Sequence, residues 1–157
     1  MQTFRVKGLD QELRVVRFEG TEGLSELFTF DITIASEDKD IAFDQVVGQK
    51  ATLMFRAGDE ARHVHGIVGD FELGDEGKKL TSYRATLVPD AWRLRHRRAS
   101  RIFQGDTVRQ IIEKVLAKAG VEVSDCRFSL REDYAPREYC VQYRESDWAF
   151  LCRLMEE

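Results

Sequence analysis

The chain is poor in cysteine, and its cysteines do not form a motif. Cys126, Cys140 and Cys152 are the three present, and no pair has the two-residue spacing of C-x-x-C. An odd number without that spacing argues against a disulfide framework. We therefore expect reduced and mostly buried thiols. Cys140 is expected to be a small core residue, because no histidine or helix start lies beside it to activate it.

Long apolar runs and a leader segment are lacking as well. No stretch approaches the roughly 20 apolar residues of a membrane-spanning helix. Residues 1–10 show no basic region followed by an apolar one. We expect a chain that does not span a bilayer, carries no signal peptide, and is synthesised and folded in the cytosol.

The composition is that of a folded, water-facing protein with a slight excess of acid. Of the 157 residues, 43% are apolar and 33% are charged, and the formal net charge is -4. Such a balance gives no long-range attraction to nucleic acid or to an anionic membrane surface. Proteins are therefore the expected partners.

Motifs of catalysis and cofactor binding are missing from the sequence. Neither G-x-S-x-G, G-x-G-x-x-G nor G-x-x-x-x-G-K-[ST] occurs, and the Gly66–Gly69 stretch is more simply a strand that bends. His63 and His65 could project from one strand face as zinc ligands, but no further ligand has suitable spacing and His96 lies in another segment. A polar strand face is the preferred interpretation. We expect no enzyme activity, no catalytic residue, no cofactor and no metal site.

The first ninety or so residues read as strands. Apolar and polar residues alternate with period two, which is typical of strands with one buried face; the apolar positions include Phe4, Val6, Leu13, Val15, Phe28, Phe30, Ile32 and Ile34. Glycine-containing turn signals separate the strands at residues 20–25, 58–60 and 74–79. A short helical turn is expected at residues 43–47. Six or so strands at this spacing predict an antiparallel β-barrel or sandwich, and we favour the barrel because closure removes exposed edges.

The pattern changes after Pro89. A short helix is expected over residues 90–98 and a longer one over about 107–119, where Thr107 and Gln110 have capping-box spacing. A strand at about 139–143 and a helix at about 147–157, capped by Ser146, complete this part. The predicted fold class is mainly β with α (α+β). The division is a barrel tube domain at residues 1–98 and a second domain at 99–157, which we interpret as truncated.

Residues 93–101 form the strongest local concentration of positive charge. Arginines beside Trp92 could bind nucleic acid, since the charges would meet phosphates and the ring could stack on a base. The alternative is a solvated segment whose charges pair with acidic groups, and the acidic whole chain favours it. A basic-patch nucleic-acid-binding module is therefore kept as the second hypothesis. Our first hypothesis places the segment at a subunit or domain junction, paired with acids there.

Five strings of residues match one family in order along the chain: 18–28 (FEGTEGLSELF), 65–68 (HGIV), 92–94 (WRL), 100–104 (SRIFQ) and 134–147 (YAPREYCVQYRESD). Together they resemble the N-terminal region of VgrG-type spike proteins of bacterial type VI secretion systems, and the resemblance covers nearly the whole chain. The last string is the longest and most specific.

The resemblance implies a fold like that of the hub proteins of contractile-tail phages. It implies a structural role in a homotrimer that stacks on the tube protein Hcp. A membrane-puncturing needle, effectors and a tip protein would belong to regions beyond this chain, and the target membrane would be reached only through that needle. Nucleic acid is not an expected partner. Assembly in the cytoplasm and translocation through the type VI machine are the implied localisation.

Overall fold

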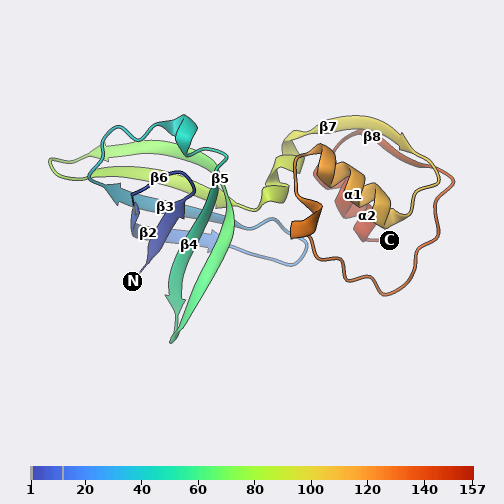
Figure 1. Ribbon diagram of the computed structural model, residues 1–157, viewed down its shortest axis with the longest axis horizontal. Coiled ribbons are helices and arrows are strands. Elements are labelled where there is room, and N and C mark those ends of the chain that lie inside the picture. Colours follow the sequence, from blue (N-terminus) through green and yellow to red (C-terminus); the bar gives the residue numbers. More distant parts are fainter. Residues whose placement is uncertain (1, 12) are drawn as a thin grey trace. The chain divides into compact units, whose positions relative to one another are not determined.

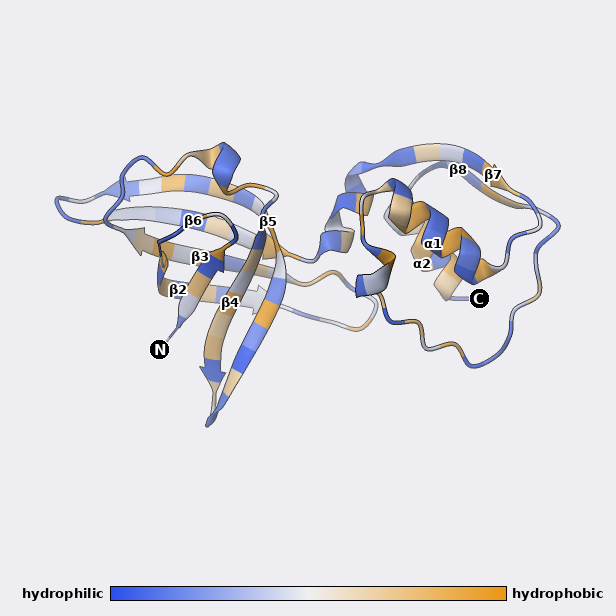
Figure 2. Cartoon of the chain, viewed as in Figure 1, coloured by the Kyte–Doolittle hydropathy of each residue, from blue (hydrophilic) through white to orange (hydrophobic). Residues whose placement is uncertain are grey.

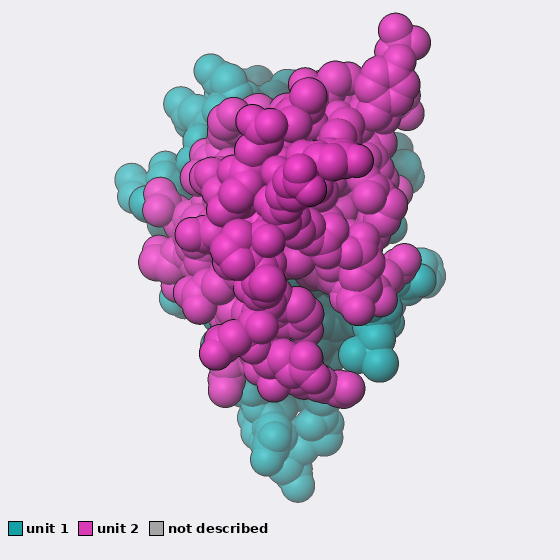
Figure 3. All heavy atoms as spheres, turned by 90° about the vertical axis from the view of Figure 1, so that its right-hand side faces the viewer, with its two compact units in different colours: residues 1–89 teal, residues 90–157 magenta. Residues whose placement is uncertain are grey.

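The structure, a computed structural model, describes residues 2–11 and 13–157. Met1, where the predicted barrel domain begins, and Glu12 lie outside the described residues. Two compact units make up the chain, residues 1–89 and residues 90–157 (Figure 3). This division lies earlier than the expected boundary after residue 98. The segment Asp90–His96 belongs to the second unit, because its residue Leu94 is buried in the core of that unit.

The first unit is a closed antiparallel barrel (Figure 1). Within the described residues its strands follow the order β1-β2-β3-β6-β5-β4, and β1 pairs with both β2 and β4 to close it. The strands are β1 (Thr3–Val6), β2 (Leu13–Thr21), β3 (Thr29–Ser36), β4 (Lys50–Ala57), β5 (Glu60–Glu76) and β6 (Thr81–Val88). The predicted antiparallel barrel is confirmed.

Alternating apolar side chains fill the barrel. Phe4, Leu13, Ile32 and Ile34 are all buried in one core, as their period-two spacing predicts. Figure 2 shows the corresponding alternation of hydrophobic and hydrophilic residues along the strands. The expected helical turn is present as η1 (Phe43–Gln45), a single 3₁₀ turn that precedes the buried Val46.

The turns between the barrel strands lie only partly at the positions that the glycines of the sequence predict. The β4–β5 hairpin turns at Gly58, whose φ of +66° suits glycine. The next turn lies later than the expected residues 74–79: β5 continues to Glu76, and Gly77 N–H donates to the Leu80 carbonyl at 2.9 Å. A register shift between Leu73 and Glu76 lets the strand run on. A second shift, between residues 68 and 70, matches the expected bend at Gly66–Gly69.

The second unit packs two helices against a short sheet. Its elements are η2 (Asp90–His96), β7 (Arg98–Phe103), α1 (Val108–Lys118), η3 (Val123–Asp125), β8 (Cys140–Ser146) and α2 (Asp147–Met155). Both expected long helices are present, and the expected strand extends further, to Ser146. The short helix expected at 90–98 is the 3₁₀ helix η2, and the last residues of that range begin β7, which the sequence had not indicated.

Helix α1 begins and packs as its sequence pattern indicates. Gln110 N–H donates to Thr107 Oγ1 at 3.2 Å, and Thr107 N–H donates to Gln110 Oε1 at 2.8 Å, which completes the capping box. Its apolar face, including Ile111 and Val115, is buried with Phe150 of α2. Over residues 2–11 and 13–157, no helix is long and apolar enough to cross a membrane.

Gly66 provides a test of barrel packing. A Cβ added to it would lie well inside van der Waals contact with the backbone carbonyl oxygen of Val88, which a side-chain rotation cannot relieve. We expect Gly66→Ala to destabilise the chain by about 1–3 kcal/mol, seen as a lower thermal midpoint in far-ultraviolet circular dichroism. Glu72→Ala, at an exposed position of the same strand, is the control, with a change within about 0.5 kcal/mol. Equal midpoints for the two variants would contradict the close approach.

Candidate functional site

The histidine pair considered for zinc lies on the outer surface of the barrel. His63 and His65 are exposed on β5 with ring centroids 6.2 Å apart, and His65 Nδ1 lies 2.9 Å from Thr52 Oγ1. Both side chains thus belong to an exposed, polar face of the strand. Among the described residues, no group of three or more His, Cys, Asp or Glu side chains is arranged to hold a metal ion.

The cysteines are free thiols in three different settings. Cys140 is buried in the core of the second unit, as expected, whereas Cys126 and Cys152 are partly exposed, so that the expectation of mostly buried thiols holds for only one of them. Burial raises the pKa of the Cys126 and Cys152 thiols, and the nearby acids Asp125 and Glu156 add to it. Both thiols are therefore protonated near neutral pH and poor nucleophiles.

The basic segment and the end of β8 meet at a buried carboxylate. Asp147 has no exposed surface, yet it begins α2 beside two arginines that follow η2. Arg101 Nη2 lies 3.0 Å from Asp147 Oδ1 and 3.1 Å from Oδ2, and Arg97 Nε lies 3.3 Å from Oδ2. The basic segment does pair with acids, but Asp147 and Asp90 lie in the same unit as the arginines, so these pairs are not at the subunit or domain junction that we expected.

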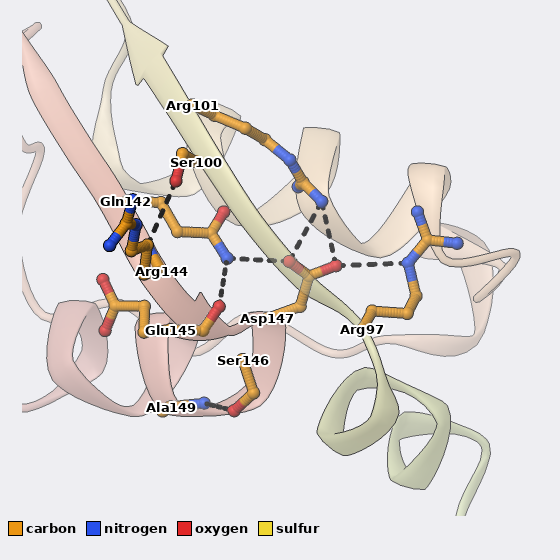
Figure 4. A network of polar contacts seen from close by, with 9 residues as sticks. All are labelled: Arg97, Ser100, Arg101, Gln142, Arg144, Glu145, Ser146, Asp147 and Ala149. Carbon is orange, nitrogen blue, oxygen red and sulfur yellow. Dashed lines mark hydrogen bonds and ion pairs between the residues drawn. The ribbon is translucent and has the colours of Figure 1, made fainter.

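Gln142 and the backbone complete the contacts of this carboxylate. Gln142, itself buried, donates from Nε2 to Asp147 Oδ1 at 2.8 Å, and Asp147 N–H donates to the Arg97 carbonyl at 2.8 Å. Figure 4 shows both guanidinium groups and the Gln142 amide pointing toward the carboxylate. A buried charge is stable only when it is paired and hydrogen-bonded, and Asp147 meets both conditions. We call Arg97, Arg101, Gln142 and Asp147 the Asp147 junction.

Local sequence explains how the junction is built. Ser146 caps α2 by accepting from Ala149 N–H at 3.1 Å, which places Asp147 in the first turn. A carboxylate there is favoured by the positive end of the helix dipole. Arg101 and Gln142 are cross-strand partners of β7 and β8, so both extend from the sheet toward the same carboxylate.

The neighbours of these residues in the 142–147 segment also have structural partners. Arg153 of α2 lies 2.7 Å from Glu145 Oε1 and donates to the Val141 carbonyl at 3.1 Å. Arg144 N–H donates to Ser100 Oγ at 3.2 Å. The most specific string of the sequence therefore joins the two strands to α2. Sequence reasoning missed the junction because Asp147 looked like an ordinary helix-start residue, and its partner Arg101 is 46 positions away.

The same contacts bear on the nucleic-acid hypothesis. Two arginines of the basic segment are committed to Asp147, and Arg93 Nε lies 3.8 Å from Asp90 Oδ1. Charges neutralised inside the unit add little to phosphate binding. Arg93, Arg97 and Arg101 therefore serve the structure of the unit, whereas Arg95 and Arg98 of the same segment are exposed.

Comparison with known proteins identifies the family. The phage tail baseplate hub (GPD) family matches residues 21–157. The chain belongs to this family. Among solved structures, the chain is similar to the c3393 protein of Escherichia coli, a component of the type VI secretion system that is described as structurally similar to the T4 phage tail proteins gp27 and gp5. Its structure superposes with a TM-score of 0.87 at 33% identity, over 97% of this chain and 42% of that one.

Spike proteins of type VI secretion are relatives of this hub chain. It is 41% identical over 150 residues to the spike protein VgrG4b of Pseudomonas aeruginosa, and the match covers 96% of this chain and 18% of that protein. It is 40% identical over 166 residues to the actin cross-linking toxin VgrG1 of Vibrio cholerae, covering 99% of this chain and 15% of the toxin. The resemblance to VgrG proteins is confirmed, and the chain spans less than a fifth of the length of either relative.

The Asp147 junction predicts a large effect from a small change. Asp147→Asn keeps the shape but removes the charge, which leaves two arginines without their counter-ion, and we expect a loss of about 3 kcal/mol in the stability of the second unit. Urea unfolding followed by tryptophan fluorescence measures it selectively, because Trp92 and Trp148 both lie in residues 90–157.

Glu113→Gln is the matched control for this prediction. It neutralises a carboxylate that lies 2.8 Å from Arg109 on the surface of α1, and we expect a change below about 0.5 kcal/mol. If both variants unfolded at the wild-type urea concentration, Asp147 would not hold the second unit together.

Proposed function

We propose that this chain is the hub-forming part of a type VI secretion spike, in which it serves as a trimeric base that stacks on the Hcp tube. The observation that carries the proposal is membership of the baseplate hub family together with a closed barrel. The resemblance to VgrG spike proteins at about 40% identity supports it.

The barrel suits a mechanical role for a physical reason. Each strand of the closed barrel is hydrogen-bonded to a neighbour on both sides. The barrel therefore exposes no unpaired strand edge that could separate under load or pair with another chain. Three copies arranged about an axis would spread the load of a contraction stroke over a ring of such barrels. The role requires stiffness and correct contacts, and no chemical step.

The second unit contributes rigidity of another kind. The Asp147 junction connects the segment after η2, the β7–β8 sheet and α2 through charge-assisted hydrogen bonds. We infer that this connection keeps the unit intact while force passes through the assembly. Catalysis is not part of the proposed role, and the toxin activity named for the Vibrio cholerae relative belongs to that protein, of which this chain matches 15%.

The proposal extends to the parent protein and its route. We propose assembly in the cytoplasm, followed by translocation through the type VI machine. The membrane-puncturing needle, and any effector or tip protein, would be carried by regions outside this chain.

Export of the tube protein tests the proposal. In a bacterium whose type VI machine depends on the parent gene, we expect removal of codons 21–157 to abolish release of Hcp into the medium, because the tube would lack its base. Asp147→Asn should lower release, and Glu113→Gln should leave it at the wild-type level. Undiminished Hcp release after the deletion would refute the hub role.

The rival function is tested separately. Because Arg93, Arg97 and Arg101 of the basic segment are paired within the unit, we expect the chain to leave the mobility of a DNA duplex and of a single strand unchanged in a low-salt gel. A retarded band whose intensity falls steeply with the logarithm of salt concentration would instead establish a phosphate-binding surface.

A further inference from the structure

One face of the β7–β8 sheet carries large apolar and aromatic side chains that are open to solvent. Ile102 is 69% exposed, Tyr139 65% and Tyr143 66%, and Val141, the cross-strand partner of Ile102, is 40% exposed. The opposite face contributes Phe103 and Cys140 to the core. We call Ile102, Tyr139, Val141 and Tyr143 the tyrosine face.

A bulge keeps the end of this face turned outward. Two residues of β8, Tyr143 and Arg144, oppose the single residue Ser100 of β7, and both are exposed. Arg144 has a φ of 49°, a conformation that a non-glycine residue adopts only when its surroundings hold it there. The hydrogen bond from Arg144 N–H to Ser100 Oγ is one such restraint. Bulges commonly redirect side chains at functional surfaces.

Two arginines flank the tyrosine face. Arg98 and Arg144 line a shallow hollow with Ala99 and Ser100, and within the described residues neither side chain is paired with a carboxylate. Instead, the Arg144 guanidinium lies 5.3 Å from the centre of the Tyr143 ring. Exposed tyrosines beside arginines are the composition that protein interfaces favour, and the charges call for an acidic partner.

The barrel offers a surface of the complementary kind. Glu19, Asp31, Thr86 and Asp70 form one cross-strand row over β2, β3, β6 and β5. They line a hollow of about 410 Å³ in the outer wall, next to the bulge between Val68 and Asp70. Glu72, Arg17 and Arg84 line it as well, and Arg17 is paired with Glu19, so that carboxylates outnumber arginines there by four to two. In the described structure, Asp31 accepts from Thr86 Oγ1 and Asp70 from Phe71 N–H, and neither has a cationic partner. We call this surface the acidic hollow.

The balance of charge between the units matches this pairing. Residues 1–89 contain 16 Asp and Glu against 11 Lys and Arg, whereas residues 90–157 contain 12 against 13. An acidic barrel and a slightly basic second unit attract each other between copies of the same chain.

We propose that the tyrosine face of one copy docks in the acidic hollow of a second copy, with Arg98 and Arg144 paired to Asp31 and Asp70. The two surfaces differ, so the contact is head-to-tail and continues from copy to copy until a ring closes. Closure at three copies rests on the proposed hub function, whereas the contact itself does not. A tyrosine or an arginine side chain fits the volume of the hollow.

A charge-swap experiment tests the contact. The face variant carries Arg98→Glu with Arg144→Glu, and the hollow variant carries Asp31→Arg with Asp70→Arg. Each alone brings like charges together, so we expect its self-association in sedimentation equilibrium to be at least about tenfold weaker than that of the wild type. A third variant that carries all four substitutions restores opposite charges at every contact, in a ring of three as well as in a pair, and its association should recover to within about threefold of the wild type.

The control variant makes the same change in charge as the face variant, but outside both proposed contact surfaces. Arg127→Glu with Arg131→Glu alters two exposed arginines of the same unit, outside both surfaces, and should associate like the wild type. Circular dichroism of every variant verifies that it is folded.

Two results would overturn the proposal. One is a wild-type chain that stays monomeric at the highest soluble concentration, which would mean that the tyrosine face is covered by something other than a second copy, either another part of the parent protein or a different protein. The other is association that survives in both charge-reversed variants or fails to return in the variant with all four substitutions, which would mean that another surface joins the copies. In either case Hcp export, the test of the hub function, is unaffected.

Discussion

A single buried carboxylate organises the second half of this protein. Asp147 is fully shielded from water, so its charge must be balanced within the unit; Arg97 and Arg101 balance it, and Gln142 adds a hydrogen bond. These partners come from the segment after η2, from β7 and from β8. Because an unpaired buried charge costs several kcal/mol, the three elements and α2 are held in one arrangement.

The two units illustrate different ways to make a rigid body. The barrel satisfies its backbone by closing on itself, and its core is a continuous set of alternating apolar side chains. The second unit has only a two-stranded sheet, which is marginal alone, and it relies on helix packing and on the Asp147 junction. A machine part that has to transmit force gains from both devices, which agrees with the family to which the chain belongs.

The surfaces that these rigid bodies present are not uniform. The tyrosine face, with its flanking arginines, and the acidic hollow lie in different units and carry opposite charge. Arg144 has a positive φ, which non-glycine residues disfavour, so the surrounding structure holds the bulge that turns Tyr143 and Arg144 outward. These two surfaces are consistent with the proposed contact between copies.

Local pattern was enough to predict the barrel, both long helices and the Thr107–Gln110 capping box, because period-two alternation and caps depend on residues close in sequence. The family resemblance was likewise carried by short strings. Only the tertiary structure revealed β7, the later β5–β6 turn and the Asp147 junction. Arg101 and Asp147 are 46 positions apart, and neither signals its partner until the strands pair. Contacts between residues that are far apart in the sequence form only when the chain folds, so local sequence patterns do not predict which residues pair or become buried together.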